Sequence, residues 1–210
     1  MTRPDGRGRF IAFEGGEGTG KSTQARLLAE RLGARLTREP GGTQLGEQLR
    51  SLLLDPANVG LDPRAEALLM AAARAQHIAE VIEPTLAAGT DLVTDRYIGS
   101  SLAYQGVARG LGVDAVASLS RFASDDLWPD LTILLVAPAE VTAARLEATG
   151  ATPDRLEALG DDFHGRVVEG FLALAQGLDD WVIVDATGPV GDVAERVWGV
   201  AAAGLGGGRR

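Results

Sequence analysis

The chain contains no cysteine and very little histidine. Without cysteine among its 210 residues, disulfide bonds, thiolate nucleophiles and cysteine metal sites are excluded. The two histidines, His77 and His164, lie far apart and lack the spacing of metal ligands, so we interpret both as surface or packing residues. Net positive charge is also lacking. The formal charge of −9 argues against nucleic acid or an anionic membrane as a partner.

Long apolar runs are absent as well. No stretch approaches the length of a membrane span and we find no signal peptide, so we expect the protein in the cytoplasm. The length suits one well-buried domain, which we predict over residues 1–203. The tail 204–210 (GLGGGRR) has no apolar face, and we expect it to be disordered.

Short apolar runs alternate with longer segments of helical periodicity. The predicted strands are 9–14, 34–37, 91–94, 131–137 and 181–185. This alternation is typical of an α/β fold whose parallel sheet is covered by helices on both faces. Asp62 and Pro63 predict the N-cap and first residue of a helix that runs to about Leu86, with Pro84 kinking or ending it.

A phosphate-binding motif follows the first predicted strand. Gly15, Gly20, Lys21 and Ser22 fit the P-loop pattern G-x-x-x-x-G-K-[ST] at the start of a predicted helix. In such a loop, backbone N–H groups surround phosphate oxygens, the lysine reaches the β- and γ-phosphates, and the hydroxyl can ligate Mg²⁺. The predicted ATP site consists of Gly15, Gly16, Glu17, Gly18, Thr19, Gly20, Lys21, Ser22 and Thr23.

Lys21 is the only lysine in the chain, whereas arginine occurs nineteen times. A planar guanidinium does not replace a compact ammonium in a loop that closes tightly around phosphates, so the bias toward arginine stops at this position. The motif alone leaves a kinase, a motor or a switch possible. The GTPase pattern N-K-x-D is absent, which excludes guanine recognition of that type.

A second anion site is indicated by Asp95 and Arg96, which follow a predicted strand at the edge where open α/β sheets bind ligands. The carboxylate can hold Mg²⁺ or its waters, and the guanidinium can bind a phosphate with two hydrogen bonds, although a plain ion pair explains the two residues equally well. Arg38, Arg50 and Arg74 also lie near predicted strand ends, which favours one shared pocket.

Four segments, GGEGTGKST, TREPGGT, LLMAAARAQH and DRYIGSSLAYQG, together resemble the thymidylate kinase family in order and spacing, over about residues 9–187. The resemblance implies a three-layer P-loop kinase fold with a five-stranded parallel sheet in the order 2-3-1-4-5. It also implies a homodimer that transfers the γ-phosphoryl group of ATP to dTMP, with Mg²⁺, and gives dTDP for dTTP biosynthesis.

The resemblance also implies roles for individual residues. The catalytic candidates are Lys21, Asp95, Arg96, Arg145 and Arg155, and the metal candidates are Ser22 and Asp95. The candidate substrate residues are Glu17, Arg38, Glu39, Arg50, Met70, Arg74, Arg96, Ser100, Ser101, Tyr104 and Gln105. Among the latter, Arg96 would bind the dTMP phosphate with Arg38 beside it, and Glu17 and Tyr104 would contact the sugar. Arg74, Ser101 and Gln105 would contact the thymine, and Arg50 would line the base pocket.

Several of these residues have plainer interpretations. Glu17 can be a solvated loop carboxylate, Ser101 a helix cap, Gln105 a surface amide and Tyr104 a core residue. The chain also departs from the family, because Met70 stands where a phenylalanine commonly stacks on the base. Methionine can still cover a ring face through its polarizable sulfur.

A lid is expected at about 145–157, where the polar segment 148–155 predicts a mobile loop. We favour Arg145 over Arg155 as the cation that reaches the phosphates, because Asp154 can pair with Arg155. The resemblance further implies a cis Glu39–Pro40 bond. Two other functions stay open at this point: a kinase for another nucleoside monophosphate or small metabolite, and a nucleotide-binding switch without enzymatic activity.

Overall fold

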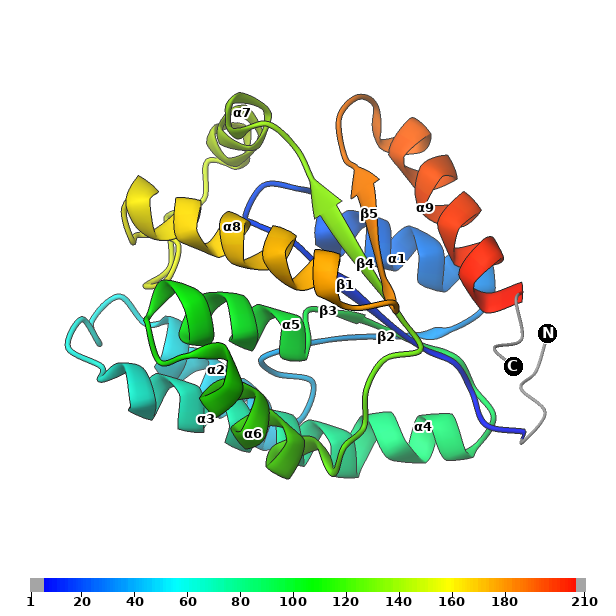
Figure 1. Ribbon diagram of the computed structural model, residues 1–210, viewed down its shortest axis with the longest axis horizontal. Helices are drawn as coiled ribbons and strands as arrows, with labels where there is room; N and C mark the ends of the chain where they lie inside the picture. Colours follow the sequence, from blue (N-terminus) through cyan, green and yellow to red (C-terminus); the bar gives the residue numbers. More distant parts are fainter. Residues whose placement is uncertain (1–5, 207–210) are drawn as a thin grey trace.

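A five-stranded parallel sheet lies between two layers of helices (Figure 1) in the computed structural model, which describes residues 6–206. The strands are β1 (Phe10–Glu14), β2 (Arg35–Arg38), β3 (Leu92–Asp95), β4 (Leu131–Val136) and β5 (Trp181–Asp185). Their order is β2-β3-β1-β4-β5, so the predicted order is confirmed. Each strand lies within one residue of its predicted limits.

The helices fill the segments between the strands. They are α1 (Lys21–Leu32), α2 (Gln44–Leu54), α3 (Pro63–His77), the π-helix η1 (Ile78–Ile82), α4 (Glu83–Ala87), α5 (Ile98–Ser101), the π-helix η2 (Leu102–Ala108), α6 (Val113–Ser124), α7 (Ala139–Thr149), α8 (Asp161–Gly177) and α9 (Val190–Gly206). Within residues 6–206, none of these helices combines the length and apolar character needed to cross a membrane.

Side chains of β1 alternate between two apolar cores, one on each face of the sheet. Ile11 and Phe13 pack in a cluster with α1 and α9. Phe10 and Ala12 pack on the other face with η1, α4, α5 and α6, and Leu134 of β4 extends that layer toward α8. A strand that is buried on both faces explains why its sequence is a continuous apolar run rather than an alternating one.

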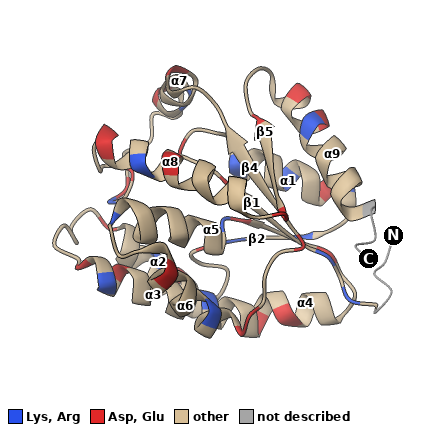
Figure 2. Ribbon diagram, viewed as in Figure 1, with Lys and Arg blue, Asp and Glu red and all other residues tan. Residues whose placement is uncertain are grey.

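The register of the strands brings three loops to one edge of the sheet. Asp95 is paired with Phe13 of β1 and with Arg38 of β2, so the segments that follow β1, β2 and β3 begin side by side. Acidic residues are spread over the outer helices α4, α6, α8 and α9 (Figure 2). The site described below lies at the carboxyl edge of the sheet.

The helix that begins at Asp62 does not end at Pro84. Asp62 is the N-cap, its side chain accepts a hydrogen bond from the Arg64 N–H, and Pro63 is the first helical residue, as predicted. The helical segment continues to Ala87 through the π-helix η1. The wider π turn lets the backbone pass Pro84, which lacks an N–H group, so the proline does not end the helical segment, and the predicted limit at about Leu86 is confirmed to within one residue.

Helix α9 continues to Gly206, three residues into the tail that we expected to be disordered. Leu205 packs at the margin of the core that contains α1 and α9, which explains why the helix extends so far. Residues 207–210 of that tail lie outside the described residues, as do residues 1–5. The single domain over 1–203 therefore stays a prediction, although one sheet carries all five described strands.

Candidate active site

The loop that joins β1 to α1 requires glycine at two positions at least. Gly15 has a φ of 143°, and a Cβ atom there would lie 2.5 Å from the carbonyl oxygen of Leu135. Gly20 is the N-cap of α1 and adopts a left-handed conformation with a φ of 89°. Glycine adopts both conformations without a side-chain clash. The loop therefore turns directly into the N-terminus of α1, a favourable place for phosphate oxygens.

Lys21 begins α1, and its side chain is 6% exposed. Its Nζ atom donates a hydrogen bond to the carbonyl oxygen of Gly16 at 2.7 Å. Burial, together with the nearby cation Arg96, lowers the pKa of Lys21 to about 8. An anion bound beside this ammonium would offset the loss of hydration, as expected for a phosphate-binding lysine.

Ser22 and Asp95 form a pair that fits a divalent cation. The Ser22 hydroxyl donates a hydrogen bond to Asp95 Oδ2 at 2.5 Å, whereas Asp95 Oδ1 is buried and has no hydrogen-bond partner among the described residues. Mg²⁺ is commonly held by one or two carboxylates together with waters and substrate phosphates. Residues 6–206 hold no cluster of three or more His, Asp or Glu for a metal.

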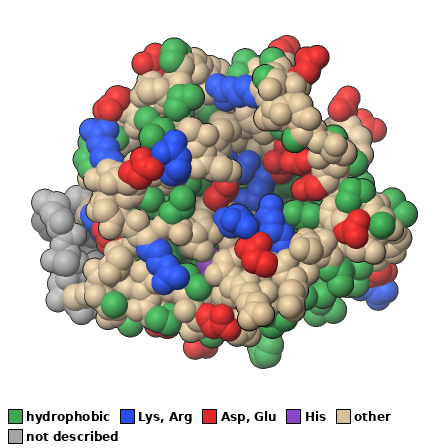
Figure 3. All heavy atoms as spheres, turned by 180° about the vertical axis from the view of Figure 1, so that it is seen from behind, with side chains coloured by type: hydrophobic (Ala, Val, Ile, Leu, Met, Phe, Trp, Pro, Cys, Tyr) green, Lys and Arg blue, Asp and Glu red, His purple; other side chains and the backbone are tan. Residues whose placement is uncertain are grey.

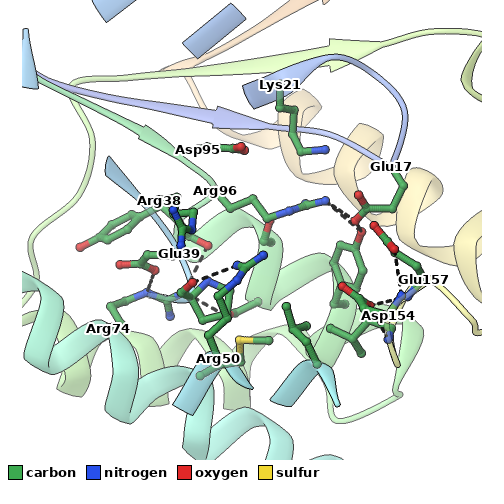
Figure 4. A pocket seen from close by; sticks show the side chains of 18 of the residues that line it. Glu17, Lys21, Arg38, Glu39, Arg50, Arg74, Asp95, Arg96, Asp154 and Glu157 are labelled. Carbon is green, nitrogen blue, oxygen red and sulfur yellow. Dashed lines mark hydrogen bonds and ion pairs between the residues drawn. The ribbon is translucent and has the colours of Figure 1, made fainter. Parts of the chain in front are cut away.

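Arg96 is the centre of a partly buried hydrogen-bond network (Figure 4). Its φ of 69° is uncommon for a residue other than glycine, and such strain is concentrated at functional sites. The guanidinium donates to Gly15 O and to Ser100 Oγ, both at 3.0 Å, and pairs with Glu17. Tyr104 donates its hydroxyl to the same Glu17 carboxylate at 2.9 Å. The arginine is thereby held in one orientation.

The charges of this network reinforce each other. Burial alone would raise the pKa of Glu17, but Arg96 and Lys21 hold that pKa at about 2. Burial alone would likewise lower the pKa of Arg96, but Glu17 raises it above the ordinary value. Both groups are therefore ionised near neutral pH. The interpretation of Glu17 as a solvated loop carboxylate is wrong, because the side chain is an ion-pair partner in the site.

Arg74 is fixed by a second buried network. Its Nε donates to Glu39 Oε2 at 2.8 Å, and its NH2 group donates to Ser101 Oγ at 3.0 Å. His77 lies between the other oxygen of Glu39, at 3.0 Å, and Thr37 Oγ1, at 2.6 Å. His77 is a buried packing residue, one of the two roles expected. The hydrogen bonds that run from Thr37 through His77 and Glu39 hold the Arg74 guanidinium at the wall of the cavity described next.

One cavity of about 250 Å³ joins the two networks, and Lys21, Ser22 and Asp95 lie on its wall. Every candidate substrate residue lines it: Glu17, Arg38, Glu39, Arg50, Met70, Arg74, Arg96, Ser100, Ser101, Tyr104 and Gln105. The interpretation of Gln105 as a surface amide is wrong, because this side chain is 1% exposed. Lys and Arg side chains gather in the central hollow of the face shown in Figure 3.

The segment after β2 bends into this cavity. The Glu39–Pro40 peptide bond is cis, which confirms the expectation. Arg50 of α2 donates to the Pro40 carbonyl oxygen at 3.0 Å, and burial followed by the charge of Arg38 lowers its pKa. Arg38 pairs with Glu47 at 3.0 Å and stays about half exposed at the mouth of the site.

The two lid arginines lie in different places. Arg145 of α7 donates to the carbonyl oxygens of Gly18, Thr19 and Ala186, at 3.5, 3.4 and 2.9 Å. It therefore lies on the outer side of the phosphate loop. A second cavity of about 330 Å³ is lined by Gly18, Thr19, Gly20, Thr23 and Arg145.

Arg155, by contrast, is bound beside the first cavity and 6% exposed. Its guanidinium donates to Leu53 O at 2.6 Å and to Glu66 Oε2 at 2.7 Å. The expected pair with Asp154 is wrong, because Asp154 Oδ1 instead accepts backbone N–H bonds from the two residues after Arg155. The structure therefore does not bring Arg155 to the phosphate loop.

The comparisons with known proteins agree on one family. The family model described as "Thymidylate kinase" matches residues 13–197. The chain is 50% identical over 195 residues to a thymidylate kinase of Thermomicrobium roseum, covering 90% of this chain and 92% of the relative. It is 47% identical over 204 residues to one of Leifsonia xyli, covering 94% and 96%. The chain belongs to the thymidylate kinase family.

A solved structure confirms the fold. The crystal structure of thymidylate kinase from Ehrlichia chaffeensis is 30% identical, with a TM-score of 0.75, and the match covers 93% of this chain and 99% of that one. Membership of the thymidylate kinase family makes the protein an ATP-binding kinase of nucleotide biosynthesis. The prediction of the P-loop kinase fold is thus confirmed.

Sequence reasoning did not assign a function to Glu14, which supports two residues of the cavity wall, Tyr97 and Ser100, from behind. It is fully buried at the end of β1 and accepts hydrogen bonds from the backbone N–H groups of Tyr97 and Ser100, at 3.0 and 2.9 Å, and from the Ser100 hydroxyl. Burial raises the pKa of Glu14 to about 7. A single acid in an otherwise apolar strand is the signal that could have revealed it.

We predict that Glu14 makes stability depend on pH. Because its pKa is raised in the folded state, the wild-type protein loses stability as pH rises from about 4.5 to about 7, by on the order of 3 kcal/mol. Glu14→Gln mimics the protonated acid and removes this loss. Urea unfolding of both proteins at pH 5 and pH 8 measures the difference, and parallel pH dependences would contradict the prediction.

Proposed function

We propose that this cavity transfers the γ-phosphoryl group of Mg-ATP to dTMP and releases dTDP and ADP. The observation that carries the proposal is the joining of two kinds of recognition in one cavity. Lys21 and Arg96 offer cations at one end, where phosphates would meet. Arg74 lies away from Lys21 in Figure 4, and together with Ser101 and Gln105 it would offer polar groups to a pyrimidine. The identity of the relatives as thymidylate kinases supports the same substrates.

On the donor side, the phosphate loop and the N-terminus of α1 would hold the β- and γ-phosphates of ATP, with Lys21 beside the group in transfer. Ser22 and the unbonded oxygen of Asp95 would hold Mg²⁺, which when bound neutralises charge on the phosphate oxygens. We place the nucleoside of ATP in the second cavity, beside Arg145 and Thr23.

On the acceptor side, an oxygen of the dTMP phosphate would attack the γ-phosphorus, and the bond to the bridging oxygen of ADP would break. Both phosphates are negatively charged, so cations must hold them together for the in-line attack. Arg96 would bind the acceptor phosphate, with Arg38 at the mouth of the site. Glu17 and Tyr104 would then lie beside the sugar.

The lid arginines would contribute differently. Arg145 already contacts the backbone of the phosphate loop, so we propose it as the lid cation nearest to ATP. Arg155 would act at the phosphates only after it leaves Glu66 and Leu53 O. We propose that the lid at about 145–157 closes over ATP and excludes water, which protects ATP from hydrolysis.

Two other functions make different predictions. A kinase for another monophosphate would share the phosphate loop but prefer another acceptor. A switch without activity would bind ATP and release no ADP in response to any acceptor. The polar groups around Arg74 favour a specific acceptor base, and the family favours dTMP.

The test is acceptor-dependent ADP release with dTMP, dUMP, UMP and CMP at saturating Mg-ATP. We expect kcat/KM for dTMP to exceed that for dUMP by roughly 10- to 200-fold at most, because one methyl group in an apolar pocket near Met70 gives no more. UMP adds a 2′-hydroxyl that would meet the Tyr104 ring, and CMP presents a donor to Arg74, so both should be far poorer. Equal kcat/KM for dTMP and CMP would overturn the proposal.

Replacement of Lys21 tests the phosphate loop itself. Lys21→Ala should keep the fold and reduce kcat by about 10²–10³, the usual effect of losing one preorganised charge-stabilising donor. Lys21→Arg should not restore turnover, because the guanidinium does not fit this loop. Arg26→Ala, an exposed position on the same helix, is the matched control. Normal turnover in well-folded Lys21→Ala would remove the loop from the mechanism.

We also propose a homodimer that forms through α2, α3 and α6. These helices pack against one another and expose large apolar side chains, namely Leu45, Leu52, Leu68 and Phe122. Phe122 is 89% exposed. Apolar groups exposed on neighbouring helices favour contact with a second copy, which presents the same surface in a two-fold dimer.

Sedimentation at micromolar concentration should give twice the chain mass of 21.8 kDa for the wild type. Because charges would be placed in the apolar contact, Phe122→Glu combined with Leu68→Glu should give a folded monomer. Leu178→Glu, an exposed apolar position outside these helices, serves as the control and should stay dimeric. A dimer of unchanged strength in the double variant would show that the interface lies elsewhere.

A further inference from the structure

Glu66 is a fully buried carboxylate on α3 to which sequence reasoning assigned no function. Three side chains from two segments donate hydrogen bonds to it, Gln105 and Arg109 from η2 and its C-cap and Arg155 from the segment after α7. Gln105 Nε2 lies 2.9 Å from Oε1, while Arg109 NH2 and Arg155 NH2 lie 2.8 and 2.7 Å from Oε2. Of these donors, Gln105 lies on the wall of the proposed thymine site. Glu66 is therefore one residue removed from the cavity.

The carboxylate of Glu66 is ionised at neutral pH. Burial alone would raise its pKa, but the hydrogen bonds from Arg109, Gln105 and Arg155 lower that pKa below the ordinary value. An ionised carboxylate has no proton to donate and can only accept hydrogen bonds. Each group that forms a hydrogen bond with Glu66 must therefore be the donor.

This requirement fixes the orientation of the Gln105 amide. An amide has one donor end and one acceptor end, and the NH₂ end of Gln105 must face Glu66. The acceptor end, Oε1, receives no hydrogen bond from the part of the chain that the structure describes. Because Gln105 lines the cavity, Oε1 is the polar atom that it offers to a ligand. The π-helix η2, which includes Gln105, is typical of functional sites.

We propose that Glu66 is a positioning residue that sets base selectivity by locking the Gln105 amide with its oxygen toward the base. The inference rests on the proposed function, since it names how that site distinguishes pyrimidines. Thymine and uracil carry an N3–H donor, which matches a fixed acceptor. Cytosine has an unprotonated N3 that accepts hydrogen bonds. Its lone pair would face the Gln105 oxygen, and both of these buried acceptors would stay unsatisfied.

Arg74 recognises only the group at C4 of the base, so selectivity at N3 requires a further residue. Its guanidinium can only donate, so it suits the O4 oxygen of thymine and rejects the amino group of cytosine. Gln105 alone could rotate by 180° and offer its NH₂ group to N3 of cytosine. With an ionised acceptor behind it, rotation would place the Gln105 oxygen against the Glu66 carboxylate. Selectivity at N3 thus depends on Glu66, which does not itself contact the base.

The test compares dUMP with dCMP in wild type and Glu66→Gln. These substrates differ only at the N3/C4 edge of the base, so their ratio of kcat/KM measures recognition of that edge alone. A glutamine at 66 can donate as well as accept, so the Gln105 amide is free to rotate. We expect the dUMP:dCMP ratio to fall at least tenfold. Because both substrates meet the same enzyme preparation, partial unfolding does not change the ratio.

Two variants separate positioning from a general structural role. Arg109→Lys alters another Glu66 partner but keeps its positive charge, so Glu66 stays an ionised acceptor for Gln105 and the ratio should keep its wild-type value. Gln105→Met removes the amide and should lower the ratio, and adding Glu66→Gln to it should change the ratio no further. An unchanged ratio in Glu66→Gln, or an equal fall in Arg109→Lys, would overturn the inference. If Glu66→Gln fails to fold, an unchanged ratio in Gln105→Met would overturn it.

Failure of the proposed function would look different. In that case the wild-type protein would phosphorylate neither dTMP nor dUMP, whatever residue stands at 66. The ratio of the dissociation constants of dUMP and dCMP, measured by titration calorimetry with the same variants, then replaces the ratio of kcat/KM. A wild type that binds the two nucleotides equally would overturn the inference as well.

Discussion

Glutamates fix the cations in and beside the cleft, and the geometry of the site depends on these ion pairs. The pairs are Glu17 with Arg96, Glu39 with Arg74, and Glu66 with Arg155. Removing a charged group from water costs several kcal/mol, and a buried pair regains that cost only with good geometry and further hydrogen bonds. Here each glutamate has a second donor as well. Loss of one partner would leave an uncompensated buried charge, so each guanidinium has one favoured position.

The same pairs explain how an acidic protein can bind two anions. The chain carries a net charge of −9, with acidic side chains spread over the outer helices, yet Lys and Arg side chains gather in the hollow of Figure 3. Burial and neighbouring arginines lower the pKa of both Lys21 and Arg50. A phosphate bound near these cations would raise their pKa values again, because its negative charge favours the protonated forms. The local surroundings, rather than the net charge, therefore decide which ligands this cleft favours.

Local rules made much of the fold predictable. The apolar runs gave strands to within one residue, and Asp62 with Pro63 gave the start of α3, because both signals depend only on neighbouring residues. The phosphate loop was also predictable, since its glycines are required by backbone conformation. The substrate residues came from a resemblance in four segments. The cavity in which they meet depends on how β1, β2 and β3 are aligned.

These local rules could not predict which buried charges pair with each other, and Arg155 shows why. Chain position favoured a pair between Arg155 and the adjacent Asp154, but Arg155 binds Glu66, 89 residues away. A neighbour in sequence stays accessible to water and gains little from an ion pair. A buried acid that already holds Gln105 and Arg109 can bind a further donor with no additional desolvation of its own. Which acid is buried is decided by the packing of α3 against the rest of the fold, so the partner of Arg155 follows from tertiary structure.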